Sequence, residues 1–155
     1  MRYFKNVFSL FSTILLLAAC AVSDGLPQLQ HWPQWQSADT RWFKLESLDA
    51  EGKVRQTSLL AVQPEADSLR FVQTDALGAP LSRQILTRQG WRNDGFAPPN
   101  PAARRLFAAI LPLLAVDGGQ IYPPQNPTPW RSQVSDGMMS VAFPDGTHWR
   151  VTPLE

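Results

Sequence analysis

Polar and apolar residues alternate along most of the chain after residue 40, and this two-residue period is typical of half-buried β-strands. The clearest run covers residues 42–48 (WFKLESL) and stops at turn residues 49–52. Comparable runs recur after short turns, so the pattern predicts four consecutive strands, at 42–48, 54–63, 69–73 and 81–88. Short strands at this spacing indicate an antiparallel meander, and a meander with one buried face needs a cover.

The period changes to a helical one after Pro101, a residue that suits the first turn of a helix. Apolar residues then recur at helical spacing, at Leu106, Ile110 and Leu113. We therefore predict a helix over 102–114 that Pro112 kinks or ends, with the sequence Asp-Gly-Gly at 117–119 as its stop. A helix this apolar must be buried, and the concave face of a curved sheet is the natural place.

Three more short strands are predicted near the C-terminus, at 130–134, 138–143 and 147–152. The turns between them, at 135–137 and 144–146, each contain Asp-Gly, a strong signal for a chain reversal. The predicted fold class is thus α+β: a curved antiparallel half-barrel sheet with an apolar helix covering its concave face.

The first 20 residues follow a different pattern. Arg2 and Lys5 precede an apolar stretch at 7–19, which is the layout of a secretory signal and is shorter than the ~20 residues of a relaxed membrane span. The stretch ends in Leu-Ala-Ala-Cys at 17–20, a lipobox, in which small residues admit a peptidase and the thiol accepts the lipid. An ordinary signal peptide with a chance cysteine is the alternative. Since Cys20 is the only cysteine of the chain, we predict cleavage before Cys20 and lipidation there.

This interpretation divides the chain into a signal peptide at 1–19, a lipidated tether at 20–40 and one domain at 41–155. A diacylglyceryl group with a palmitate-type N-acyl chain would anchor the protein firmly, whereas one chain binds only marginally. Ala21 stands where enteric bacteria use aspartate to retain a lipoprotein in the inner membrane, so we expect the periplasmic face of the outer membrane. Trp32 and Trp35 are expected to dock on the domain; the membrane interface is the alternative.

The net charge and the sequence motifs of the chain narrow the range of possible functions. Without Arg2 and Lys5 the chain keeps 12 of its 14 basic residues against 13 acidic ones, a formal charge of −1, which does not suggest a nucleic-acid partner. With His31 and His148 as the only histidines, we expect no metal site and no cofactor. No catalytic motif is present, so we expect no enzyme. Several aspartates fall at predicted turns, where a structural role is expected: Asp67, Asp75, Asp94, Asp136 and Asp145.

The order of meander, apolar helix and three closing strands, behind a lipobox, resembles the LolA/LolB superfamily of lipoprotein carriers. The closest local match is 69–78 (LRFVQTDALG), which looks like a LolB strand followed by a projecting Asn-Pro-Leu-Gly loop. The resemblance, which covers 41–152, implies that Leu77 contacts the membrane; packing of Leu77 at a hairpin end is the alternative. The chain is also similar to an uncharacterised proteobacterial lipoprotein family within this superfamily, often encoded beside aryl-polyene lipid biosynthesis genes. Only one convincing helix is found here, fewer than in LolB-type receptors.

The leading hypothesis is a binding module that holds or transfers an acyl-type lipid or a lipoprotein cargo, as in aryl-polyene lipid export. Candidate residues for the apolar cavity lie on the strands and on the helix: Leu45, Leu60, Phe71, Leu86, Leu106, Phe107, Ile110 and Leu111. The same residues could instead fill a closed core. The alternative function is a non-enzymatic accessory lipoprotein that docks a membrane transporter or assembly machine without carrying lipid. A transporter or a LolA-like carrier is the candidate protein partner. Arg104 and Arg105 are expected at the solvated start of the helix.

Overall fold

The computed structural model describes residues 26, 39–95, 98–114 and 128–154. Cys20, Ala21, Trp32 and Trp35 lie outside the described residues, as does the helix stop expected at 117–119. Leu26, in the predicted tether, is half-buried and packs against the core. The signal peptide and the lipid anchor therefore remain predictions.

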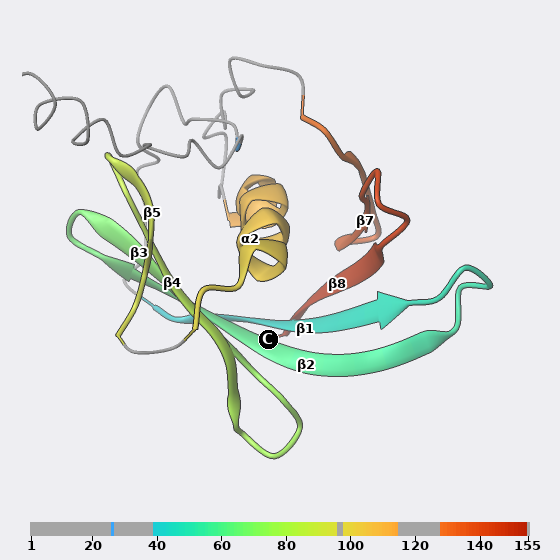
Figure 1. Cartoon of the computed structure of the whole chain (residues 1–155), viewed down its shortest axis with the longest axis horizontal. Coiled ribbons are helices and arrows are strands. Elements are labelled where there is room, and N and C mark those ends of the chain that lie inside the picture. The colour runs from blue at the N-terminus through green and yellow to red at the C-terminus, as the bar shows by residue number, and fades with distance from the viewer. Residues whose placement is uncertain (1–25, 27–38, 96–97, 115–127, 155) are drawn as a thin grey trace, which may run out of the picture.

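One curved antiparallel sheet forms the body of the domain (Figure 1), in the order β5-β4-β3-β2-β1-β8-β7-β6. Its strands are β1 (Arg41–Leu48), β2 (Val54–Glu65), β3 (Ser68–Thr74), β4 (Pro80–Thr87), β5 (Gly90–Asn93), β6 (Arg131–Ser135), β7 (Met138–Ala142) and β8 (His148–Leu154). The chain runs outward from β1 to β5, crosses to the opposite edge, and returns to β8, which pairs with β1. The sheet stays open between its edge strands β5 and β6, so it is a half-barrel.

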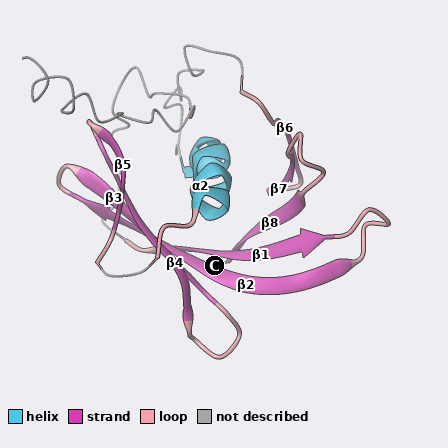
Figure 2. Cartoon of the chain, viewed as in Figure 1, coloured by secondary structure: helices cyan, strands magenta, loops and turns pink. Residues whose placement is uncertain are grey.

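The helix α2 (Pro101–Leu114) belongs to the crossover and lies in the hollow of the curved sheet (Figure 2). Its buried residues are all apolar: Ala103, Leu106, Phe107, Ala108, Ala109, Ile110, Leu111 and Leu114. They join the inward residues of the strands in one core. The predicted α+β class, with a curved half-barrel and a covering helix, is confirmed.

The alternation in β1 shows why the sequence folds this way. Phe43 and Leu45 are buried on the inner face, whereas the intervening Lys44 is partly exposed. The register then places Phe43 beside Leu60 and Leu45 beside Val151, so inward residues meet across three strands. Strands β1 to β4, β7 and β8 contribute buried apolar residues to this core, and the sheet bends around α2.

The hairpin of β6 and β7 follows from its Asp-Gly pair. Asp136 and Gly137 both have positive φ, of 52° and 76°, as a two-residue type I′ turn requires. Asp136 is the only non-glycine residue with positive φ in the described part of the chain. The turn sets Ser135 opposite Met138 and fixes the register of the β6–β7 hairpin.

Strand β5 was not predicted from the sequence. It has only four residues, begins at Gly90 (φ 111°), and is too short for its alternation to be recognised. Its pairing with β4 holds it in place, with Trp91 opposite Leu86. The Trp91 ring also packs on Phe71, with ring centroids 5.0 Å apart. Tertiary packing, and not a local sequence pattern, therefore explains why residues 90–93 form a strand.

The prediction that Pro112 could end the helix is wrong, because α2 continues to Leu114. Proline inside a helix costs ~3 kcal/mol. Burial of Leu111 and Leu114, on either side of Pro112, stabilises the last turn by about 1.5–3 kcal/mol each. The proline itself is exposed, so its ring does not disturb the contact between helix and sheet.

Candidate functional site

The eight residues predicted to line an apolar cavity lie together in one core cluster where α2 meets the sheet. Leu45, Leu60, Phe71 and Leu86 come from β1 to β4, and the other four come from α2. Phe71 and Phe107 stack at the centre of this contact, with ring centroids 5.2 Å apart and an interplanar angle of 13°. The sequence thus identified the residues that face one another across the helix–sheet contact.

These side chains are packed tightly in the structure. None of the eight exposes more than 5% of its surface, and Leu45, Leu60, Phe71, Phe107 and Ile110 expose none. A side chain with no exposed surface borders no space large enough for a water molecule. An acyl chain can therefore reach these residues only if α2 moves away from the sheet.

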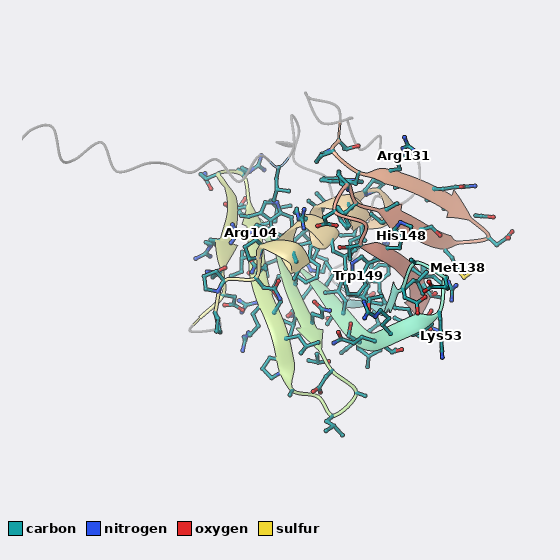
Figure 3. The ribbon with its side chains drawn as sticks, turned by 45° about the vertical axis from the view of Figure 1, so that its right-hand side comes forward. Lys53, Arg104, Arg131, Met138, His148 and Trp149 are labelled. Atoms are coloured by element: carbon teal, nitrogen blue, oxygen red, sulfur yellow. The ribbon has the colours of Figure 1, made fainter. Side chains whose placement is uncertain are left out.

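The N-terminal end of α2 is fixed by polar side chains. Asn100 caps the helix, because its Oδ1 accepts a hydrogen bond from the Ala103 amide (3.0 Å), and its Nδ2 donates to the Leu81 carbonyl (3.4 Å). Arg104, which Figure 3 labels, donates to Gln84 Oε1 on β4 (3.1 Å) and to Asn93 Oδ1 (3.0 Å), at the end of β5. These contacts tie the start of the helix to one edge of the sheet.

Arg105 ties the same end of the helix to the opposite arm of the sheet. Its guanidinium donates to Asp145 Oδ2 (2.7 Å) in the β7–β8 turn, and it lies over the Phe143 ring, 5.3 Å from the ring centroid. Hydrogen bonds from the hydroxyl and amide of Thr147, with that from Arg105, lower the pKa of Asp145 from 3.8 to about 2. The prediction of a solvated helix start is wrong for Arg104, which is half-buried and binds β4, whereas Arg105 stays partly exposed and pairs with Asp145 in the β7–β8 turn.

The C-terminal end of α2 is held by the first residue of β1. Arg41 donates through Nη1 to the carbonyls of Leu114 (3.2 Å) and Leu113 (3.5 Å). A cation at the C-terminus of a helix is favourable because the last carbonyls carry partial negative charge. Three arginines therefore fasten α2; we call Arg41, Arg104 and Arg105 the fastening arginines.

Leu77 lies in the loop between β3 and β4, at the end of a hairpin that extends beyond the rest of the sheet (Figure 1). Asp75 Oδ1 accepts hydrogen bonds from the amides of Leu77 (2.9 Å) and Ala79 (2.8 Å), and Gly78 has a φ of 84°. This ordered loop leaves 94% of Leu77 exposed. The structure thus excludes the alternative in which Leu77 packs at the hairpin end.

The other candidate groups have structural roles. Asp75 and Asp145 bind turn amides as expected, whereas Asp94 bridges Arg70 (2.7 Å) and Arg83 (3.1 Å) on the outer face. His148 is exposed at the start of β8 (Figure 3). Within the described residues there is no cluster of potential metal ligands, and no helix is long and apolar enough to span a membrane.

Sequence reasoning missed a group of buried polar residues on the inner face: Ser58, Gln73, Ser82 and Gln84. They are 0–5% exposed, and Gln84 is opposite Phe71 in the strand register. A polar residue in a strand is usually assigned to the outer face. The signal that could have revealed these residues is their phase, since Gln73 is two residues from Phe71 and Gln84 is two from Leu86.

Comparisons with known proteins were made for both the sequence and the fold. No family model, no curated protein and no solved structure matches this chain. Function must therefore be argued from the geometry of the half-barrel and its helix.

Proposed function

We propose that this protein is a membrane-anchored, non-enzymatic lipoprotein that binds or transfers an acyl-type lipid or lipidated cargo, with α2 as the lid of the site. The observation that carries the proposal is how α2 is held. Its buried residues are all apolar, and its ends are fixed by the three fastening arginines. The sheet pairs strand to strand without α2, so the helix can move without breaking the sheet.

The energetics favour a ligand that covers apolar surface. Opening α2 alone would expose its apolar face and the inner face of the sheet to water, at about 25 cal/mol per Å². An acyl chain placed between them would cover both surfaces and remove its own apolar area from water. The free energy of binding is then the gain from covering the apolar surface of the lipid minus the cost of opening the helix.

The exposed Leu77 loop supports the membrane side of the proposal. Partition of one leucine into a bilayer is worth about 1.5–3 kcal/mol, which is enough to orient a protein already tethered by lipid at Cys20. The loop is held by its own hydrogen bonds before any contact is made, so insertion costs little ordering. Together with the predicted anchor, the loop supports a site beside the outer membrane, on its periplasmic side.

The test is native mass spectrometry of the chain from Ala21 to Glu155, purified without detergent and incubated with acyl lipids. We expect added mass that dissociates as lipid. Arg105→Gln loosens the lid by less than about 1 kcal/mol, because the Arg105–Asp145 pair is partly exposed, and should speed lipid uptake up to about fivefold. Arg55→Gln removes the same charge from an exposed position of β2 and should leave uptake unchanged. An unchanged apo mass after incubation would refute the proposal.

A second candidate function, docking of a membrane transporter or assembly machine, is favoured by apolar residues on the outer face. Trp42 and Leu154 are paired across β1 and β8, with Leu59 nearby on β2, and they are 46%, 42% and 37% exposed. In this case a stoichiometric protein partner should co-purify from native membranes with the wild type. The partner should be lost with Trp42→Ser, while no lipid binds.

A further inference from the structure

The inner face of the sheet changes from apolar to polar beside the N-terminal end of α2. Gln73 is paired with Leu60 on one side and with Ser82 on the other, while Gln84 lies opposite Phe71 in the next row. Ser58 completes the group through a hydrogen bond from Gln73 Nε2 to its Oγ (2.9 Å). We call Ser58, Gln73, Ser82 and Gln84 the inner polar cluster.

The hydrogen bonds of this cluster are incomplete. Gln84 Nε2 reaches Ser82 Oγ at 3.4 Å, and Gln84 Oε1 accepts from Arg104. Among the described residues, none donates to Oε1 of Gln73, and the hydroxyl hydrogens of Ser58 and Ser82 find no acceptor. Buried polar groups without partners destabilise a fold, so three of them in one core call for an explanation.

We propose that the inner polar cluster is the polar end of the lipid site and binds the uncharged head of an acyl lipid, one that carries a hydroxyl and an ester group. This inference rests on the proposed function. The hydroxyls of Ser58 and Ser82 can donate their free hydrogens to an ester carbonyl, and the free Oε1 of Gln73 can accept a hydrogen bond from a hydroxyl of the lipid head.

The charge of the cluster selects against an anionic head. Its four side chains are neutral, and they are at least 95% buried. The cation that contacts them, Arg104, is hydrogen-bonded to Gln84 and Asn93. A carboxylate or phosphate buried there would lose its hydration, and it could pair with Arg104 only if the guanidinium gave up Gln84 and Asn93.

The position of the cluster fits one end of a long ligand. Gln84 is beside Phe71, which stacks under Phe107 of α2, so the polar and apolar parts of the inner face are continuous. The lid covers both, because Arg104 of α2 contacts Gln84 and the helix cap Asn100 contacts Leu81. One movement of α2 would therefore open the head site and the tail site together.

The experiment compares 1-monooleoylglycerol with oleate, which has the same tail and a charged head, on the chain from Ala21 to Glu155. We expect the wild type to bind the monoacylglycerol at least tenfold more tightly. Gln73→Met keeps the length of the side chain and removes its polar atoms; it should abolish this preference, leave oleate binding unchanged, and not lower the urea midpoint of unfolding. Ser82→Ala, a smaller change, should reduce the preference several-fold.

Gln63→Met makes the same chemical change on the exposed outer side of β2 and should alter neither affinity. If the wild type binds both lipids equally, or if Gln73→Met retains the preference, the inner polar cluster is not a head site while lipid binding itself stands. If the wild type binds neither lipid, the proposed function fails and this inference fails with it.

Discussion

The stacked pair of Phe71 and Phe107 offers a quantitative test of how α2 sits in the half-barrel. Both rings are fully buried, one on β3 and one on the helix. Replacing either ring by leucine should lower the free energy of unfolding by about 1–2 kcal/mol. This loss is larger than that of a volume-conserving substitution and smaller than the 3–5 kcal/mol that Phe→Ala costs. Stacked aromatic pairs contribute about 0.5–1.5 kcal/mol beyond their buried area. The double variant should therefore lose less than the sum of the single losses by that amount.

Urea unfolding of the four proteins, followed by circular dichroism, gives this coupling energy directly. A control cycle pairs Phe71→Leu with Val141→Ala on β7, where β2, β1 and β8 lie between the two strands. Distant sites add within about 0.3–0.5 kcal/mol, so the control should show no coupling. A Phe71–Phe107 coupling as small as the control would mean that α2 does not rest on β3 in solution, and the lid argument would lose its basis.

Three further predictions address the loop and the fastening arginines. Leu77→Asp should change the free energy of unfolding by no more than about 0.5 kcal/mol, because the side chain is exposed. It should weaken binding to vesicles at least tenfold relative to Leu77→Met. Equal binding of the two variants would exclude membrane contact by the loop. The pKa of Asp145 is lowered from 3.8 to about 2, so its stabilising contribution is complete above pH 3.8 and is lost as the pH falls towards 2. Asp145→Asn should remove that part of the acid sensitivity, measured as urea midpoints between pH 5 and pH 2; an unchanged acid profile would contradict the assignment. Arg41→Gln should speed hydrogen exchange of the amides of residues 110–114 several-fold and leave the exchange rates in β8 unchanged. Unchanged exchange at 110–114 would mean that other groups hold the Leu113 and Leu114 carbonyls.

The sheet could be predicted because its signal is local. In β1 the inward positions 43 and 45 are apolar, as are 69 and 71 in β3, so one window of the sequence fixes both the strand and its inner face. Strand β5 has no such window, since four residues with one tryptophan carry almost no period. Pro112 shows the opposite case, in which a strong local rule gives way to burial of the residues around it.

The candidate site was predictable to the same extent. The eight apolar residues were found because phase alone puts them on the inner face. The fastening contacts were not, because their partners are far apart in sequence: Arg104 and Gln84 are separated by 20 residues, Arg105 and Asp145 by 40, and Arg41 and Leu114 by 73. A sequence shows that an arginine can donate hydrogen bonds, but only the fold shows which acceptors it meets.

A filled core and a lipid site are compatible if α2 is a lid. An open half-barrel without ligand would expose a large apolar surface, which promotes aggregation. Filling that surface with a helix from the same chain avoids the exposure, and it makes apparent affinity the product of intrinsic affinity and the open fraction. Return of the helix would then help to expel the lipid at the membrane. It follows that the fastening arginines, more than the apolar lining, should set how tightly lipid is held, since they change the open fraction without changing the surface that the acyl chain contacts.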